Sequence, residues 1–166
     1  MVAYLFFASG INNFAKLPVL KENIYDVSSF SNVELNKKIS ILFFIGNNVD
    51  KRQGDALNLN QKIYKRFYEF DDFQFVVLCP IGTEELVAQL RNKLEFGTNT
   101  DMKKWNFIFS DSTQISKTFK SLKSDMNLDK YYGSNYVYIV DKERSQRGRN
   151  DDNGTKFGYD SRSVAD

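Results

Sequence analysis

Four short apolar runs dominate the hydrophobic pattern of this chain. They cover residues 39–45, 73–79, 105–109 and 136–140 and consist mostly of β-branched, aliphatic and aromatic residues. Runs of this length, bounded by Gly, Pro or polar residues, are typical of strands that are buried on both faces. We therefore predict four core strands at these positions.

A helix is predicted between the first and second runs, over about residues 56–70. Its apolar residues recur at helical spacing, and they are Leu59, Ile63, Phe67 and Phe70. Asp55 is the candidate N-cap residue of this helix. The polar stretch 46–54, GNNVDKRQG, is then predicted to be a loop.

Two further helices are predicted after the second and third runs. The first covers residues 83–97, with Thr83 as N-cap residue and Gly97 at its end. Its buried face is marked by Leu86, Leu90 and Leu94. After the third run, Asp111 and Gln114 have the spacing of a capping box. The apolar positions of that last helix are Ile115, Phe119 and Leu122.

Strands that alternate with helices imply crossover connections on a largely parallel sheet. Residues 17–20 are expected to be extended, and residues 141–149 are expected to turn back as a hairpin. The predicted fold is therefore an α/β domain with three layers, α/β/α, a mostly parallel central sheet and a C-terminal β-hairpin. We assign it to residues 17–160, with a mobile tail at 161–166.

The composition restricts the chemistry that the chain can perform more than it restricts the fold. Its 166 residues include one cysteine, Cys79, and no histidine. An intrachain disulfide, a Ser–His or Cys–His nucleophile and an imidazole metal site are therefore excluded. The 23 basic and 21 acidic residues nearly balance, so we expect no nucleic-acid partner.

The longest uninterrupted apolar run, residues 2–8, is too short to cross a bilayer, which takes roughly 20 residues. We interpret residues 1–16 as the remnant of an N-terminal anchor or as a loosely packed end. Contact with a membrane is expected only through an anchor that this chain does not itself contain.

Several local strings resemble one family when their order and spacing are taken together. They are LPVL at 17–20, ISILFF at 39–44, WNF at 105–107 before Ser110-Asp111, YIVDK at 138–142 and RGR at 147–149. Over residues 17–160 the chain is similar to the SCO/SenC family of thioredoxin-like proteins, especially its divergent Bacteroidetes members. The resemblance implies a thioredoxin-like fold and a role in electron transport, at the copper site of cytochrome oxidase. It also implies an inner-membrane anchor and a domain that faces the periplasm.

The chain departs from this family where the family keeps its copper ligands. The resemblance places a CxxxC motif after the first core strand, where residues 46–51 contain no thiol. It places a histidine shortly before the last core strand, where residues 133–135 read Gly-Ser-Asn. Asn, Ser and Asp are hard ligands that do not replace soft ones for copper. We therefore expect no cofactor, no metal site and no catalytic residue.

Three candidate sites remain. Asn47, Asn48, Asp50 and Lys51 occupy the position of the family's active site, and we interpret them either as contacts of a binding loop or as a solvated turn. Cys79 ends a buried strand and is either an inert core residue or a lone reactive thiol. A near match to a calcium loop has an arginine in its first ligand position, which opposes metal binding; its residues are Arg149, Asp151, Asn153, Gly154 and Asp160.

The hypothesis that follows is a non-catalytic SCO-like domain without the copper ligands. It would act with a protein partner as a binding or assembly factor in the cell envelope, related to the assembly of the cytochrome oxidase copper site. One alternative is a thioredoxin-fold oxidoreductase that uses Cys79. A second is a membrane-tethered structural domain with no ligand.

Overall fold

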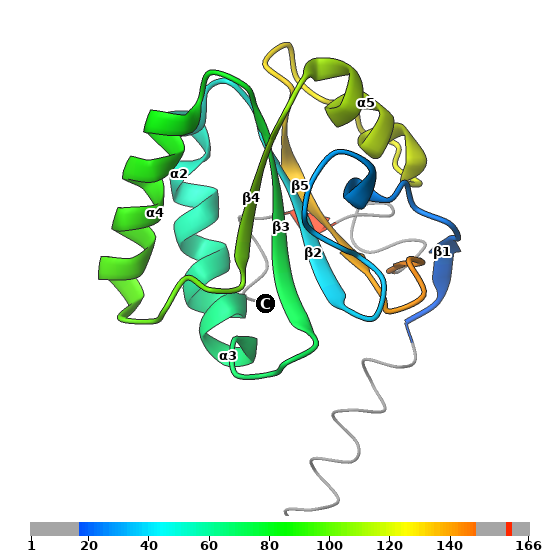
Figure 1. Cartoon of the computed structure of the whole chain (residues 1–166), viewed down its shortest axis with the longest axis horizontal. Coiled ribbons are helices and arrows are strands. Elements are labelled where there is room, and N and C mark those ends of the chain that lie inside the picture. Colours follow the sequence, from blue (N-terminus) through cyan, green and yellow to red (C-terminus); the bar gives the residue numbers. More distant parts are fainter. Residues whose placement is uncertain (1–16, 149–158, 161–166) are drawn as a thin grey trace, which may run out of the picture.

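A single seven-stranded sheet forms the middle of the computed structural model, which describes residues 17–148 and 159–160 (Figure 1). The strand order is β1-β6-β5-β2-β3-β4, and β7 also pairs with β5. The strands are β1 (Val19–Lys21), β2 (Ile39–Ile45), β3 (Phe73–Pro80), β4 (Trp105–Ser110), β5 (Gly133–Val140), β6 (Gln146–Arg147) and β7 (Tyr159–Asp160).

The four predicted core strands are confirmed as β2, β3, β4 and β5. Every residue of β3 is buried, and so is all of β2 except its first residue. Both strands lie in the interior of the sheet, which explains why their sequences carry apolar residues on both faces. β5 begins three residues earlier than predicted, at Gly133.

The prediction of a mostly parallel sheet is wrong, because the sheet is mixed. β2 pairs with β3 and β3 with β4 in parallel, whereas the other four pairings are antiparallel. The reason is the connection before β5. Residues 122–132 return the chain to the edge where β2 ends, so β5 must run in the direction opposite to β2.

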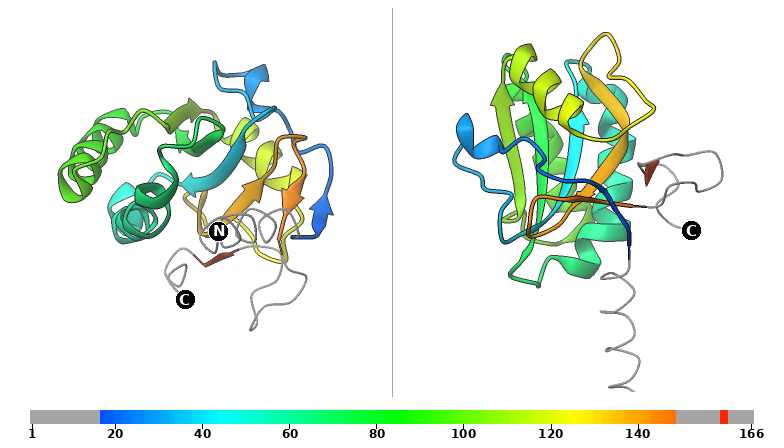
Figure 2. Two further views of the ribbon diagram at one scale, coloured as in Figure 1. Left: turned by 90° about the horizontal axis from the view of Figure 1, so that it is seen from below. Right: turned by 90° about the vertical axis from the view of Figure 1, so that its right-hand side faces the viewer.

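Helices cover both faces of the sheet, which confirms the three-layer architecture (Figure 2). One face carries α2 (Val49–Leu59), the π-helix η2 (Asn60–Tyr64), α3 (Lys65–Phe67) and α4 (Glu84–Thr98). The other carries α5 (Ser112–Ser121) and the segment around the short 3-10 helix η1 (Val27–Ser29). Each face has its own apolar core.

The helix after β2 begins seven residues before its predicted start, at Val49 rather than at 56. Asn48 is its N-cap residue, since the Asn48 side chain accepts a hydrogen bond from the Lys51 N–H at 3.3 Å. The predicted loop 46–54 and the predicted cap Asp55 are therefore wrong. The apolar pattern hid these first turns because Arg52, a charged residue, occupies a core-facing position there.

The prediction for α4 needs three smaller corrections. Val87, rather than Leu86, joins the buried face, and Leu86 is 38% exposed. The helix continues past Gly97 to Thr98 and ends at Asn99, which adopts a left-handed conformation with φ 52°. Thr83 precedes the helix as expected, but its hydroxyl donates to the Pro80 carbonyl instead of capping.

The predicted cap of α5 and the predicted C-terminal hairpin are both confirmed. The Asp111 side chain caps α5 by accepting a hydrogen bond from the Gln114 N–H at 2.9 Å. β6 turns back on β5 as the expected C-terminal hairpin.

The predictions for residues 1–16, for the tail 161–166 and for the calcium-like positions Arg149, Asp151, Asn153 and Gly154 lie outside the described residues. Within residues 17–148 and 159–160, no helix has the length and apolar character needed to cross a membrane.

Candidate functional site

Two loops meet at the edge of the sheet where β2 ends. Ile45 pairs with Gly133, and the Asn47 N–H donates to the Tyr131 carbonyl at 2.7 Å. Gly46 makes this contact possible: its φ is +73°, and a Cβ atom there would lie 2.7 Å from both the Gly133 nitrogen and the Tyr131 carbonyl oxygen. The stretches 46–51 and 133–135, which the resemblance identified as the ligand positions, are therefore in direct contact.

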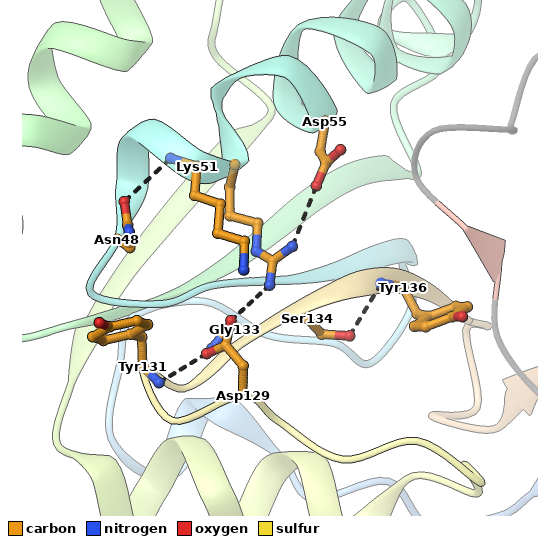
Figure 3. Close-up of polar contacts among 9 residues, drawn as sticks. Asn48, Lys51, Asp55, Asp129, Tyr131, Gly133, Ser134 and Tyr136 are labelled. Carbon is orange, nitrogen blue, oxygen red and sulfur yellow. Dashed lines mark hydrogen bonds and ion pairs between the residues drawn. The ribbon is translucent and has the colours of Figure 1, made fainter.

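A buried arginine fills the corner between these loops. Arg52, in the first turns of α2, is only 4% exposed. One of its terminal nitrogens lies 2.7 Å from Asp129 Oδ2, and the other lies 3.6 Å from Asp55 Oδ2. Figure 3 shows Asp55 and Asp129 on opposite sides of this guanidinium. The pair joins α2 to the loop that leads into β5.

Asp129 organises that loop. Its Oδ1 accepts hydrogen bonds from the N–H groups of Tyr131, at 2.8 Å, and Gly133, at 2.9 Å (Figure 3). Partial burial raises the pKa of Asp129, but these N–H groups and Arg52 outweigh it, so that the pKa lies below its ordinary value. Asp129 is therefore ionised at neutral pH and holds the guanidinium in place.

The sequence interpretation missed both members of this ion pair. Val49, Arg52, Ala56 and Leu59 recur at helical spacing and are all buried. A helix period extended upstream would have placed Arg52 in the core and required a carboxylate partner for it. Nothing in the sequence singles out Asp129, which is 77 residues away.

All four predicted contact residues lie at the N-terminal end of α2 and are exposed. The Asn48 side chain is engaged as the helix cap. Asn47, Asp50 and Lys51 present one amide and two opposite charges to solvent. Two further exposed side chains lie at the same edge of the sheet, Tyr131 and Ile81. The surface therefore offers hydrogen-bonding, charged and apolar contacts.

Cys79 lies in the core and not at this edge. It is fully buried, and its thiol contacts the Val77 carbonyl at 3.5 Å. Burial, with a smaller contribution from Glu84, raises the pKa of the Cys79 thiol far above its ordinary value. A thiolate is the nucleophilic form of cysteine, so the burial and the raised pKa of this side chain both oppose its reaction in the folded protein.

No metal centre is formed by the residues that the structure describes. Nowhere among them do three His, Cys, Asp or Glu side chains gather closely enough to hold an ion. The corner at Arg52 contains two carboxylates, and a guanidinium stands between them.

Comparison with known proteins shows the fold. No protein-family model and no curated protein matches the chain. A SCO1/SenC family lipoprotein from Bacillus anthracis is similar in structure, with 15% identity, a TM-score of 0.52 and 89% of each chain covered. BsSco, a member of the Sco family of cytochrome c oxidase assembly proteins, matches with 15% identity and a TM-score of 0.53, over 89% of this chain and 88% of BsSco. The resemblance inferred from the sequence is thereby confirmed at the level of a thioredoxin-like fold.

Proposed function

We propose that this chain is a non-catalytic SCO-like domain that acts as a binding or assembly factor in the cell envelope, in support of cytochrome oxidase copper-site assembly. The observation that carries the proposal is the Arg52–Asp129 ion pair. It occupies the corner between the two stretches where the resemblance expects copper ligands. The fold is kept, while the chemistry of that corner is replaced.

A guanidinium at this position opposes copper binding. It carries a permanent positive charge, and it satisfies the carboxylate that would otherwise be the nearest anionic ligand. Soft thiolate or imidazole ligands suit Cu(I), and the corner contains neither. Electron transfer through Cys79 is opposed by the burial of that thiol.

The exposed surface next to the ion pair is suited to a protein partner. Asp50 and Lys51 extend from the first turn of α2, which the Asn48 cap and Arg52 hold in place. A surface that is already rigid loses little conformational entropy when it binds. An exposed aromatic side chain such as Tyr131 is of the type enriched at protein interfaces, and the charged side chains Asp50 and Lys51 suit the polar rim of such an interface.

Deletion of the gene tests the proposal directly. We expect the deletion to lower cytochrome oxidase activity without lowering total cellular copper, and wild-type protein to restore that activity. The charge-reversed variant Asp50→Lys/Lys51→Glu is expected to fold normally and to fail in rescue. The matched control is Lys65→Glu/Glu69→Lys, which reverses two exposed charges, one in α3 and one in the turn that follows it. Unchanged oxidase activity in the deletion strain would overturn the assembly role and favour a structural domain.

A Cu(I) titration against a chromophoric chelator tests the loss of the metal site. We expect no stoichiometric, tight binding by the wild-type chain or by the variant Cys79→Ala. Tight binding at one equivalent would contradict the proposal. Fractionation of cells that produce the full chain tests the envelope location, which is refuted if the protein is recovered with the cytoplasm.

A further inference from the structure

The end strand β4 has an open backbone edge. β4 pairs with β3 on one side only, and it is the last strand in the sheet order. The parallel pairing uses the backbone groups of Asn106, Ile108 and Ser110, so the N–H and C=O groups of Phe107 and Phe109 point away from the sheet. Among the described residues, nothing pairs with these groups. Figure 1 shows β4 at the front of the sheet, between α4 on one side and α5 on the other.

Within residues 17–148 and 159–160, this edge lacks the features that usually prevent strand addition. Its sequence, WNFIFS, contains no proline and no charged residue. Natural proteins protect exposed edges with charges, proline, bulges or covering segments. The side chains of Phe107 and Phe109 lie on the α4 face and pack against its core, so the strand is anchored to the domain while its outer backbone edge stays open.

The charges at the two ends of β4 are opposite. Lys103 and Lys104 precede the strand, and Asp111 follows it in an extended conformation, with φ −71° and ψ 164°. Lys103 also lies 3.3 Å from Asp101, but its side chain is 82% exposed and can turn to a second partner. An antiparallel copy of the same strand brings the acidic end of one beside the basic start of the other. A parallel copy would bring like charges together. The edge is therefore complementary to itself in the antiparallel direction.

We propose that a second copy of this chain docks on β4 in antiparallel orientation, centred on Ile108. Phe107 of each copy then lies opposite Phe109 of the other, and the N–H and C=O groups of both residues form hydrogen bonds across the interface. The aromatic rings form cross-strand pairs on one face. Asp111 lies diagonally across from Lys103 of the second copy, at about 7–8 Å between backbones, within reach of a lysine side chain. The two sheets become one continuous sheet.

Sedimentation velocity over a wide range of protein concentration tests this dimer. We expect the wild-type chain to pass from monomer to dimer as its concentration rises. Phe107→Ala and Phe107→Pro both remove the ring, but only proline removes the outward N–H. The alanine variant is expected to keep a weakened dimer and the proline variant to stay monomeric. A wild-type chain that stays monomeric throughout, or equal dimerisation of the two variants, would overturn the proposal.

Hydrogen exchange of the Phe109 amide in the wild-type chain identifies the occupant of the edge and needs no variant. We expect protection of this amide to rise with protein concentration. High protection at every concentration would mean that another segment of the same chain covers β4, and fast exchange at every concentration would mean that nothing does. Either result would refute the dimer.

The charge contact has its own test. Asp111→Asn keeps a good helix cap and removes the charge, and we expect it to weaken the dimer about threefold or more. An unchanged dissociation constant would reject the antiparallel arrangement.

Discussion

Replacement of Asp129 by asparagine tests the role assigned to the buried ion pair. The change keeps the size of the side chain and removes its charge. Arg52 is then left in a site where its side chain is 5% exposed, with only Asp55 at 3.6 Å as a counter-ion. Removal of one member of a buried pair costs about 3–5 kcal/mol. The Asp129 side chain is 29% exposed, so we expect a loss of about 2–3 kcal/mol in the free energy of unfolding.

Urea unfolding measures this loss, with the fluorescence of the single tryptophan, Trp105, as the probe. Trp105 is buried and stacks on Phe75 at 4.4 Å between ring centroids, so unfolding will change its emission. The matched control is Asp125→Asn, the same substitution at an exposed position four residues earlier. It should change stability by less than about 0.5 kcal/mol. An Asp129→Asn variant that is as stable as this control would refute the reasoning.

A double-mutant cycle and the pH dependence separate the ion pair from other effects. Arg52→Met combined with Asp129→Asn should cost less than the sum of the single changes, by about 1 kcal/mol or more. Because the pKa of Asp129 is lowered in the folded protein, its contribution is complete above the unfolded value of about 3.9 and is lost as the pH falls through the folded value. Asp129→Asn should therefore remove part of the acid-induced loss of stability.

Three further predictions concern neighbouring features. Gly46→Ala should lower the free energy of unfolding by about 2 kcal/mol or more, because the added Cβ atom would collide with backbone atoms. Gly54→Ala is the control: a Cβ atom at this position on α2 meets no other atom, and the change should raise stability by about 0.5–1 kcal/mol in the same urea titration. Cys79 should not react with a thiol reagent until the protein unfolds, and rapid labelling of the native protein would contradict its burial. Asn48→Ala should cost about 1 kcal/mol through loss of the cap, whereas Asn48→Asp should restore stability.

The positions of the core strands could be predicted because burial on both faces leaves a local signature. β2 and β3 are apolar along nearly their whole length, and no contact with a distant residue is needed to recognise them. The capping box at Asp111 is likewise local, since donor and acceptor are three residues apart. The direction of β5 could not be predicted from a local pattern. It depends on the edge of the sheet to which residues 122–132 lead before the strand begins.

The candidate site shows the same division. The sequence alone established that the chain has one cysteine and no histidine, and it identified the exposed polar positions that begin α2. The tertiary structure decided what occupies the corner behind them. Arg52 and Asp129 lie 77 residues apart and meet only because Ile45 pairs with Gly133. A charge in a helix's buried face is stable only with a distant partner, and that partner is set by the folded chain rather than by any local pattern.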